Sequence, residues 1–418
     1  MDRRTFLKLS GTAGLTLGLT PAMTSLAYGR ERYDGPFWVF VHASGGWDPT
    51  LLCDPKGALS EADPDPVNRF LASEIVEAGP FRLPPLDFVL EFFDRFGDDL
   101  LVMNGLDTGT NSHSVGTRHV WSGSTDPTQP SLGALVAGTL PEPPSLAYLA
   151  NGGYTEAAGL VANTRLTDTE DLLALAWPER LDPGNEGSAL FGPATTARLA
   201  AARDVRLAAL LDRTTLPRQR RAMQVLREAR SLDNELRDLA DALPDDLANG
   251  GLEAQAQVAM ACFKSGVSAC ASLALGGFDT HGDHDNRHTP RMQQLLAGVE
   301  FVVDEAERQG LADRVIVVVG SDFARTPGFN SGNGKDHWPV TSMLAMGPGI
   351  VGGRVVGASD ERQRARTIDP ESLQLDEDGV RLTPGHVHAA LRELAGIDGH
   401  EDALLHAVGE RLPRLLEG

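Results

Sequence analysis

The feature that most constrains the fold is a set of short, continuously apolar segments. The clearest is 314–320, which contains the run Val-Ile-Val-Val-Val, and 37–42 has the same character. Residues 100–104, 269–275 and 341–346 are further strand candidates. Strands that lack alternation between apolar and polar residues are buried on both faces, and such strands are typical of parallel sheets.

Helical patterns lie between these segments. Apolar residues recur at helical spacing in 86–96 and 291–309, while 255–266 also has a helical composition. Thr383 followed by Pro384 indicates the start of a last helix. This alternation predicts an α/β fold with a mainly parallel central sheet and helices on both faces.

The domain organisation follows from a change in composition. The composition changes over about 141–250, and within this segment residues 197–243 are rich in Ala, Leu, Arg and Glu, which favours a helical insertion. We therefore expect one α/β domain at 34–412 that contains this insertion.

The first residues are typical of an export signal. Arg3 and Arg4 form a paired-arginine region, a modest apolar stretch follows at 9–19, and 25–27 offers the small residues that a signal peptidase accepts. The apolar stretch is too short and too polar for a membrane span, which needs about 20 apolar residues. We expect 1–27 to be a twin-arginine signal peptide, the translocase to be a partner during export, and the mature protein to be periplasmic or extracellular.

Composition limits the partners of the mature protein. The formal net charge of -21 disfavours binding to nucleic acid or to anionic lipid. An anionic substrate therefore needs local positive charge, most simply bound cations. The three cysteines, Cys53, Cys262 and Cys270, have no C-x-x-C spacing. They are predicted to be buried free thiols, with one disulfide as the open alternative.

Polar residues follow the predicted strands, where ligands bind in open parallel sheets. The residues concerned are Asp48 after the first strand, Ser112 to Ser114 after the second, Asp279 and His281 after the third, Asp322 and Arg325 after the fourth, and Lys335 to His337 before the fifth. Each has a structural alternative, since Asp48 and Asp322 also suit helix N-caps and the histidines also suit exposed loops. Together they predict a mixed oxygen and nitrogen shell for one or two divalent ions, zinc or manganese by preference.

Three ordered motifs carry a family resemblance. Gly-Gly-Phe-Asp-Thr-His at 276–281, Val-Val-Gly-Ser-Asp-Phe-Ala-Arg-Thr at 318–326 and Asn-Gly-Lys-Asp-His at 333–337 resemble the signature of family 1501 of the domains of unknown function. The resemblance implies an exported protein related in fold to the alkaline phosphatase and sulfatase superfamily. It does not imply a settled activity.

The resemblance also implies roles for individual residues. Asp279 and His281 look like a pair that binds one metal with His337, and Asp322 looks like a ligand of a second metal that shares Asp48. Ser112 is similar to the position of the superfamily's nucleophile, for which Ser114 is an alternative. Arg325 or Lys335 would then bind an anionic oxygen of the substrate.

Departures from the family pattern leave two points open. Phe323 stands where the superfamily enzymes usually have a metal-binding histidine, so one metal is as consistent as two. Pro49 follows Asp48 where the family usually has glycine, so the entry loop differs. The segment 53–57 lacks the final arginine of C-x-P-x-R, which excludes a formylglycine sulfatase.

Two functional classes remain. The first is an exported, metal-dependent hydrolase of phosphate or related esters, acting on a small-molecule or polymer substrate, with Ser112 as nucleophile. The second is a non-catalytic exported protein with a structural metal, acting in surface assembly or ligand binding.

Overall fold

The computed structural model describes residues 32–417 except for 167–172, 175, 217–222, 224–235 and 245–247. The predicted signal peptide at 1–27 lies outside these residues. Within the part that the structure describes, no helix is long and apolar enough to cross a membrane.

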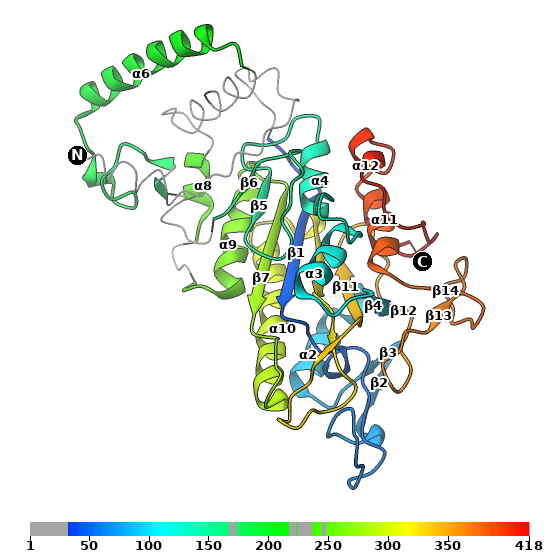
Figure 1. The fold of residues 1–418 in the computed structure, drawn as a ribbon. Helices are drawn as coiled ribbons and strands as arrows, with labels where there is room; N and C mark the ends of the chain where they lie inside the picture. Colours follow the sequence, from blue (N-terminus) through cyan, green and yellow to red (C-terminus); the bar gives the residue numbers. More distant parts are fainter. Residues whose placement is uncertain are drawn as a thin grey trace.

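An eight-stranded sheet forms the centre of the molecule (Figure 1). Its strands, in spatial order, are β12 (Arg354–Val356), β4 (Leu101–Asp107), β11 (Val340–Met346), β8 (Val315–Ser321), β1 (Phe37–Ser44), β7 (Cys270–Gly276), β5 (Tyr148–Ala150) and β6 (Asn163–Thr164). β11 pairs antiparallel with both of its neighbours, and every other pairing in the sheet is parallel. The predicted, mainly parallel sheet is therefore confirmed.

Helices cover both faces of the sheet, as predicted (Figure 1). Alternate residues of β1 enter two separate cores: Val39 and Val41 belong to one, and Trp38 and Phe40 to the other. The first core is covered by α2 (Asp87–Phe96), α8 (Leu236–Ala242), α9 (Gly251–Lys264) and α10 (His284–Arg308). The second is covered by α3 (His113–Ser122), α4 (Leu132–Thr139), α11 (Pro384–Leu394) and α12 (Glu401–Leu405). Burial on both faces explains why β1 carries no polar alternation.

Smaller elements complete the described part of the chain. Paired short strands are β2 (Val76–Ala78) with β3 (Phe81–Leu83), β9 (Ala324–Arg325) with β10 (His337–Trp338), and β13 (Thr367–Ile368) with β14 (Val380–Arg381). Short 3₁₀ helices are η1 (Pro49–Leu51), η2 (Ala72–Glu74), η3 (Gly97–Asp99), η4 (Glu186–Ser188) and η5 (Ala312–Arg314).

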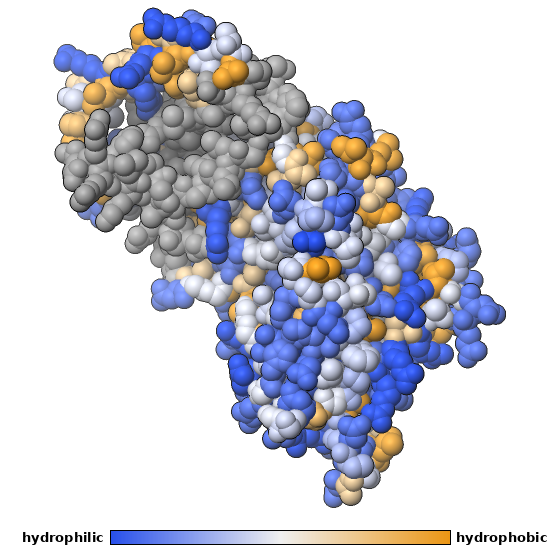
Figure 2. Space-filling view, in the orientation of Figure 1, coloured by the Kyte–Doolittle hydropathy of each residue, from blue (hydrophilic) through white to orange (hydrophobic). Residues whose placement is uncertain are grey.

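The segment expected to be a helical insertion is of mixed structure. It begins with β5 and β6, which extend the sheet, and only then reaches α6 (Pro193–Arg213) and α8. Figure 1 shows α6 far from the sheet, and Figure 2 shows a mostly hydrophilic body with apolar side chains along α6. Leu199, Val205 and Leu210 of this helix are all exposed.

One edge of the sheet gathers the polar motifs. The carboxyl ends of β1, β4, β7 and β8 meet there because these strands run in the same direction. β11 runs in the opposite direction, so its amino end reaches the same edge and places His337 beside the other motifs. α10 begins at His284 rather than near 291, which brings two histidines of its first turns to this edge as well.

Candidate metal centre

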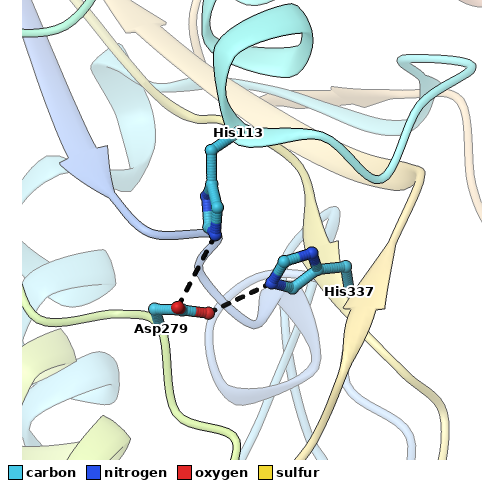
Figure 3. A group of neighbouring side chains, drawn as sticks. All are labelled: His113, Asp279 and His337. Carbon is cyan, nitrogen blue, oxygen red and sulfur yellow. Dashed lines mark hydrogen bonds and ion pairs between the residues drawn. The ribbon is translucent and has the colours of Figure 1, made fainter.

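Three side chains from different loops converge at this edge (Figure 3). One ligand atom from each of His113, Asp279 and His337 can be chosen so that all three lie within 4.8 Å of one another. The Nε2 atom of His337 is 3.1 Å from Oδ1 of Asp279, and Nε2 of His113 is 3.6 Å from Oδ2. His281 adds a further nitrogen, because its Nε2 lies 3.0 Å from both Asp279 Oδ1 and His337 Nε2.

The hydrogen bonds of the Nδ1 atoms determine whether Nε2 of each ring carries a lone pair. Nδ1 of His337 donates to the backbone oxygen of Asn111 at 2.8 Å, and Nδ1 of His281 donates to Asp336 at 2.7 Å. A neutral imidazole that donates through Nδ1 has a lone pair on Nε2. The two Nε2 lone pairs of His281 and His337 therefore face each other, an arrangement that a cation between them stabilises.

The spacing of these atoms fits a divalent ion. Two ligand atoms that each lie about 2.0 Å from a tetrahedral zinc ion are roughly 3.3 Å apart. The separations of 3.0–3.6 Å around Asp279 bracket that value. Imidazole and carboxylate donors also suit zinc and manganese. The side chains of Asp279 and His281 are each 46% exposed, so solvent reaches the centre.

Asp279 is held in place by Arg325. The guanidinium donates from Nη2 to Asp279 Oδ1 at 2.8 Å. Burial opposes ionisation of Asp279, but the surrounding contacts, led by the hydrogen bond from Arg325, outweigh it and lower the pKa of the carboxyl below its ordinary value. The loop after β1 packs closely against Asp279, and glycine at position 45 makes this possible. A Cβ there, at a φ of +118°, would lie 2.5 Å from the backbone nitrogen of Asp279.

Arg325 itself is fully buried. Its remaining hydrogen bonds go to the backbone oxygens of Gly45, Gly46 and Lys335. The side chain that was predicted to bind a substrate oxygen thus holds the loop after β1 and orients Asp279. A direct contact with substrate remains a prediction, and it requires some of these bonds to open.

Asp322 lies behind His113. Its Oδ2 accepts from His113 Nδ1 at 2.6 Å, and its Oδ1 lies 3.0 Å from Nε2 of His42. Burial opposes ionisation, but the hydrogen bond from His42, with further bonds from His113 and Gly45, lowers the pKa of Asp322 to about 2. A carboxylate on the distal nitrogen of a ligand histidine orients the ring and raises its basicity. The structure therefore places Asp322 against a ligand, outside the group of three.

Phe323 packs its apolar ring against the candidate centre. Its ring centroid is 4.8 Å from that of His113 and 4.5 Å from that of His337. Phe323 is fully buried and packs against two candidate ligands.

Asp48 belongs to a separate, fully buried network. Its Oδ1 accepts from the backbone nitrogen and hydroxyl of Thr50, and its Oδ2 accepts from Lys335 Nζ at 2.6 Å and His284 Nε2 at 3.2 Å. Burial opposes ionisation, but the Lys335 charge and His284 outweigh it and hold the pKa of Asp48 far below its ordinary value. The ammonium also donates to Asn68 at 3.1 Å. Since a carboxylate offers about four lone-pair sites, protein donors occupy those of Asp48.

The same network defines the protonation of two further histidines. His288 Nε2 accepts from the backbone nitrogen of Asp48, so its Nδ1 donates to the hydroxyl of Thr280. That hydroxyl in turn donates to Nδ1 of His284 at 2.8 Å. Burial lowers the pKa of both histidines. Each accepts a hydrogen bond on one ring nitrogen and is therefore neutral, and among the described residues the positive charge that contacts Asp48 directly is that of Lys335.

Ser112 lies at the amino end of α3, next to His113. Its hydroxyl is exposed and lies 3.3 Å from that of Ser114, its partner among the described residues. The backbone oxygen of Asn111 accepts a hydrogen bond from His337. Ser112 therefore lies between two residues that contact the centre, Asn111 and His113. Both serines remain candidates for a nucleophile.

The structure thus brings together Asp279, His281 and His337, whose role as metal ligands stays a prediction. Asp322 contacts the ring of His113 and lies outside this group, and Asp48 belongs to the buried network of Lys335. His113 and Asp336 were not among the residues assigned as metal ligands from the sequence. The available signals were weak: His113 follows the candidate Ser112, and Asp336 adjoins His337.

The fold and the site define a class of protein: a mainly parallel α/β sheet with an Asp/His cluster at the edge where its loops meet. The chain belongs to the family described as Protein of unknown function (DUF1501), whose model matches residues 38–376. The predicted family is therefore confirmed. No curated protein matches the sequence.

Solved structures of several kinds are similar to this chain at low sequence identity. A sulfatase from Pseudoalteromonas sp. has 11% identity and a TM-score of 0.37, with 91% of this chain and 72% of that chain covered. The lipoteichoic acid synthase from Listeria monocytogenes has 9% identity and a TM-score of 0.34, with 90% and 80% covered. Alkaline phosphatase from the Antarctic bacterium TAB5 has 12% identity and a TM-score of 0.32, with 75% and 92% covered.

Proposed function

We propose that this protein is an exported, metal-dependent hydrolase of phosphate or related esters. The observation that carries the proposal is the convergence of Nε2 atoms on Asp279 at the amino end of α3, beside Ser112 (Figure 3). His113, Asp279, His281 and His337 would hold one divalent ion. The Lys335 ammonium already neutralises Asp48, which favours one ion over two.

The proposed ion has a distinct chemical role. When bound, a divalent ion polarises a phosphoryl oxygen and offsets negative charge that develops on it. The chain's own residues hold the ligands: Arg325 orients Asp279, Asp336 orients His281, and Asp322 orients His113. The half-exposed side of Asp279 and His281 leaves room for a substrate oxygen.

Ser112 is the proposed nucleophile, with Ser114 as the alternative. A bond forms between the serine Oγ and phosphorus while the bond from phosphorus to the ester oxygen breaks. The serine proton passes to water, and the leaving alkoxide takes a proton from water. A second water then cleaves the phosphoserine, which releases phosphate and restores the hydroxyl.

One observation favours the alternative of a non-catalytic protein with a structural metal. Among the described residues, the Ser112 hydroxyl has Ser114 as its hydrogen-bond partner and no histidine or carboxylate base. A nucleophilic serine usually has such a base or an ion beside it. The two functions therefore differ in whether ester turnover accompanies metal binding.

The deciding experiment combines metal analysis of the purified protein with a panel of phosphomonoesters and phosphodiesters. We expect bound zinc or manganese and turnover that is abolished in Asp279→Ala and in one of Ser112→Ala and Ser114→Ala. Asp285→Ala removes a partly exposed acid on α10 that pairs with Arg69; it is the matched control and should retain full activity. Full metal occupancy without turnover of any ester would support the alternative, and absence of metal binding would refute both.

Export is proposed on the amino-terminal sequence alone. Replacing Arg3 and Arg4 by lysine preserves charge but removes the paired arginines, so the precursor should accumulate in the cytoplasm. Fractionation of cells that express the two forms measures this. Equal amounts of both forms outside the cytoplasm would contradict a twin-arginine route.

A further inference from the structure

A buried histidine in the central strand contacts the candidate centre from behind. His42 is 3% exposed and is surrounded in β1 by apolar residues. We propose that His42 is a positioning residue, which acts through Asp322 to fix both the ring of His113 and the place of α3. This inference rests on the proposed metal centre, because His113 is one of its ligands.

The hydrogen bonds define the direction of each proton. Nε1 of Trp121 can only donate, and it lies 2.9 Å from Nδ1 of His42. Nδ1 of His42 is therefore the acceptor, and its Nε2 carries the hydrogen that is donated to Asp322 Oδ1 at 3.0 Å. The second oxygen of Asp322 accepts from Nδ1 of His113. The lone pair of His113 is thereby placed on Nε2, which faces Asp279.

This chain of bonds begins and ends on the same helix. His113 is the first residue of α3, and Trp121 lies two turns later. Both are bonded to the His42–Asp322 pair, in which His42 belongs to β1 and Asp322 directly follows the adjacent strand β8. Gly116 lies between them, and a Cβ there would be 2.2 Å from the backbone oxygen of Asp322. The helix therefore packs directly on the strand end.

One buried pair of residues therefore positions both a candidate metal ligand and the candidate nucleophile. The His42–Asp322 pair restrains α3 along its axis, so it fixes His113 and the adjacent Ser112 together. Loss of the imidazole leaves Asp322 buried with fewer donors, and the carboxylate is then free to turn away from His113. Outer partners of metal ligands typically change metal affinity 10–100-fold when mutated.

The test uses the purified protein without added metal and then with zinc. In His42→Phe we expect zinc affinity, measured with a competing chelator, to fall by at least about 10-fold. His42→Gln keeps an amide donor near the Nε2 position and should recover most of the affinity. His119→Gln, on the same helix and bonded to the Thr108 oxygen, is the matched control and should leave the affinity unchanged.

A second readout does not depend on metal. Nitrogen NMR of the metal-free protein at mildly alkaline pH should show His113 protonated on Nδ1 in the wild type and a mixture of tautomers in His42→Phe. If that variant fails to fold, Trp121→Phe tests the same chain, because it removes the donor to His42 while keeping a buried aromatic ring, and it should lower zinc affinity several-fold. A wild-type affinity and an unchanged His113 tautomer in a folded variant would overturn the inference.

The outcomes separate this inference from the proposed function. A wild-type protein that binds no zinc refutes the metal centre, while the NMR tautomers still decide whether His42 orients His113. A wild-type protein that binds zinc, with variants that bind it equally well, preserves the centre and refutes the role of His42.

Discussion

The buried ammonium of Lys335 allows a quantitative prediction. Lys335 and Asp48 are both fully buried and lie 2.6 Å apart. Replacing the lysine by methionine keeps most of the length of the side chain but leaves the carboxylate without its cation. Removing one partner of a buried ion pair costs about 3–5 kcal/mol, because the remaining charge is not compensated. We expect Lys335→Met to lower the free energy of unfolding at neutral pH by that amount.

The control for this loss is an exposed ion pair. Arg362 Nη1 lies 2.9 Å from Asp65 Oδ2, and both side chains are more than half exposed. Arg362→Met should cost less than about 1 kcal/mol, since solvent screens such pairs. Adding Asp48→Asn to Lys335→Met should recover part of the loss, because the double variant buries no charge.

The loss depends on pH with a definite sign. In the wild type the pKa of Asp48 is depressed, so its ionisation stabilises the fold above the ordinary pKa near 3.8, and that contribution is lost as the pH falls through the folded pKa. Without Lys335, burial dominates and raises the pKa of Asp48, so the variant is penalised most at neutral pH. The difference between the proteins should shrink as the pH falls from about 7 toward about 4.

Denaturant unfolding at several pH values, followed by circular dichroism, measures these differences. A loss below about 1 kcal/mol at neutral pH, equal to that of Arg362→Met, would refute the assignment of Lys335 as the buried partner of Asp48. A loss that does not vary with pH would show that packing, and not the uncompensated carboxylate, causes it.

Three further predictions follow from single contacts. Asp336→Ala removes the acceptor for His281 Nδ1, so zinc affinity should fall about 10-fold in a chelator competition, and an unchanged affinity would remove His281 from the centre. Gly116→Ala should cost about 1–3 kcal/mol in thermal unfolding through overpacking, whereas Gly192→Ala, with nothing within 4 Å of its Cβ, should cost far less; equal losses would contradict the close packing of α3. The three cysteines are buried and free, and burial raises the pKa of each thiol, so a thiol reagent should modify them only after denaturation; rapid labelling of the native protein would contradict their burial.

Much of the sheet could be predicted because its strands are buried on both faces. Val315–Ser321 and Phe37–Ser44 each begin with five consecutive apolar residues, a pattern that few other structures require. The direction of β11 could not be predicted, since the residues of a strand do not reveal whether the connection before it crosses the sheet. β5 and β6 have three and two residues, too few to show any periodicity.

The candidate centre was predictable in part for a similar reason. Asp279 and His281 follow a recognisable strand, so topology alone places them at the correct edge. The partner of Asp48 was not predictable, because Lys335 lies 287 residues away and a lysine in a polar loop usually remains in solvent. His113 resembles any histidine at the start of a helix until its contact with Asp322 is known. Free thiols were correctly favoured for the cysteines.

The Nδ1 bonds of the candidate ligands have a consequence for how the centre assembles. Asp336, which binds His281, is adjacent to His337, and Asn111, which binds His337, is two residues before His113. The Nδ1 atom of each of these two histidines is thus held by the segment that carries another candidate ligand. The segments therefore depend on one another, so displacement of one ligand disturbs its neighbours. Substitutions at different ligands should then be strongly non-additive, and partial centres of intermediate affinity should be rare.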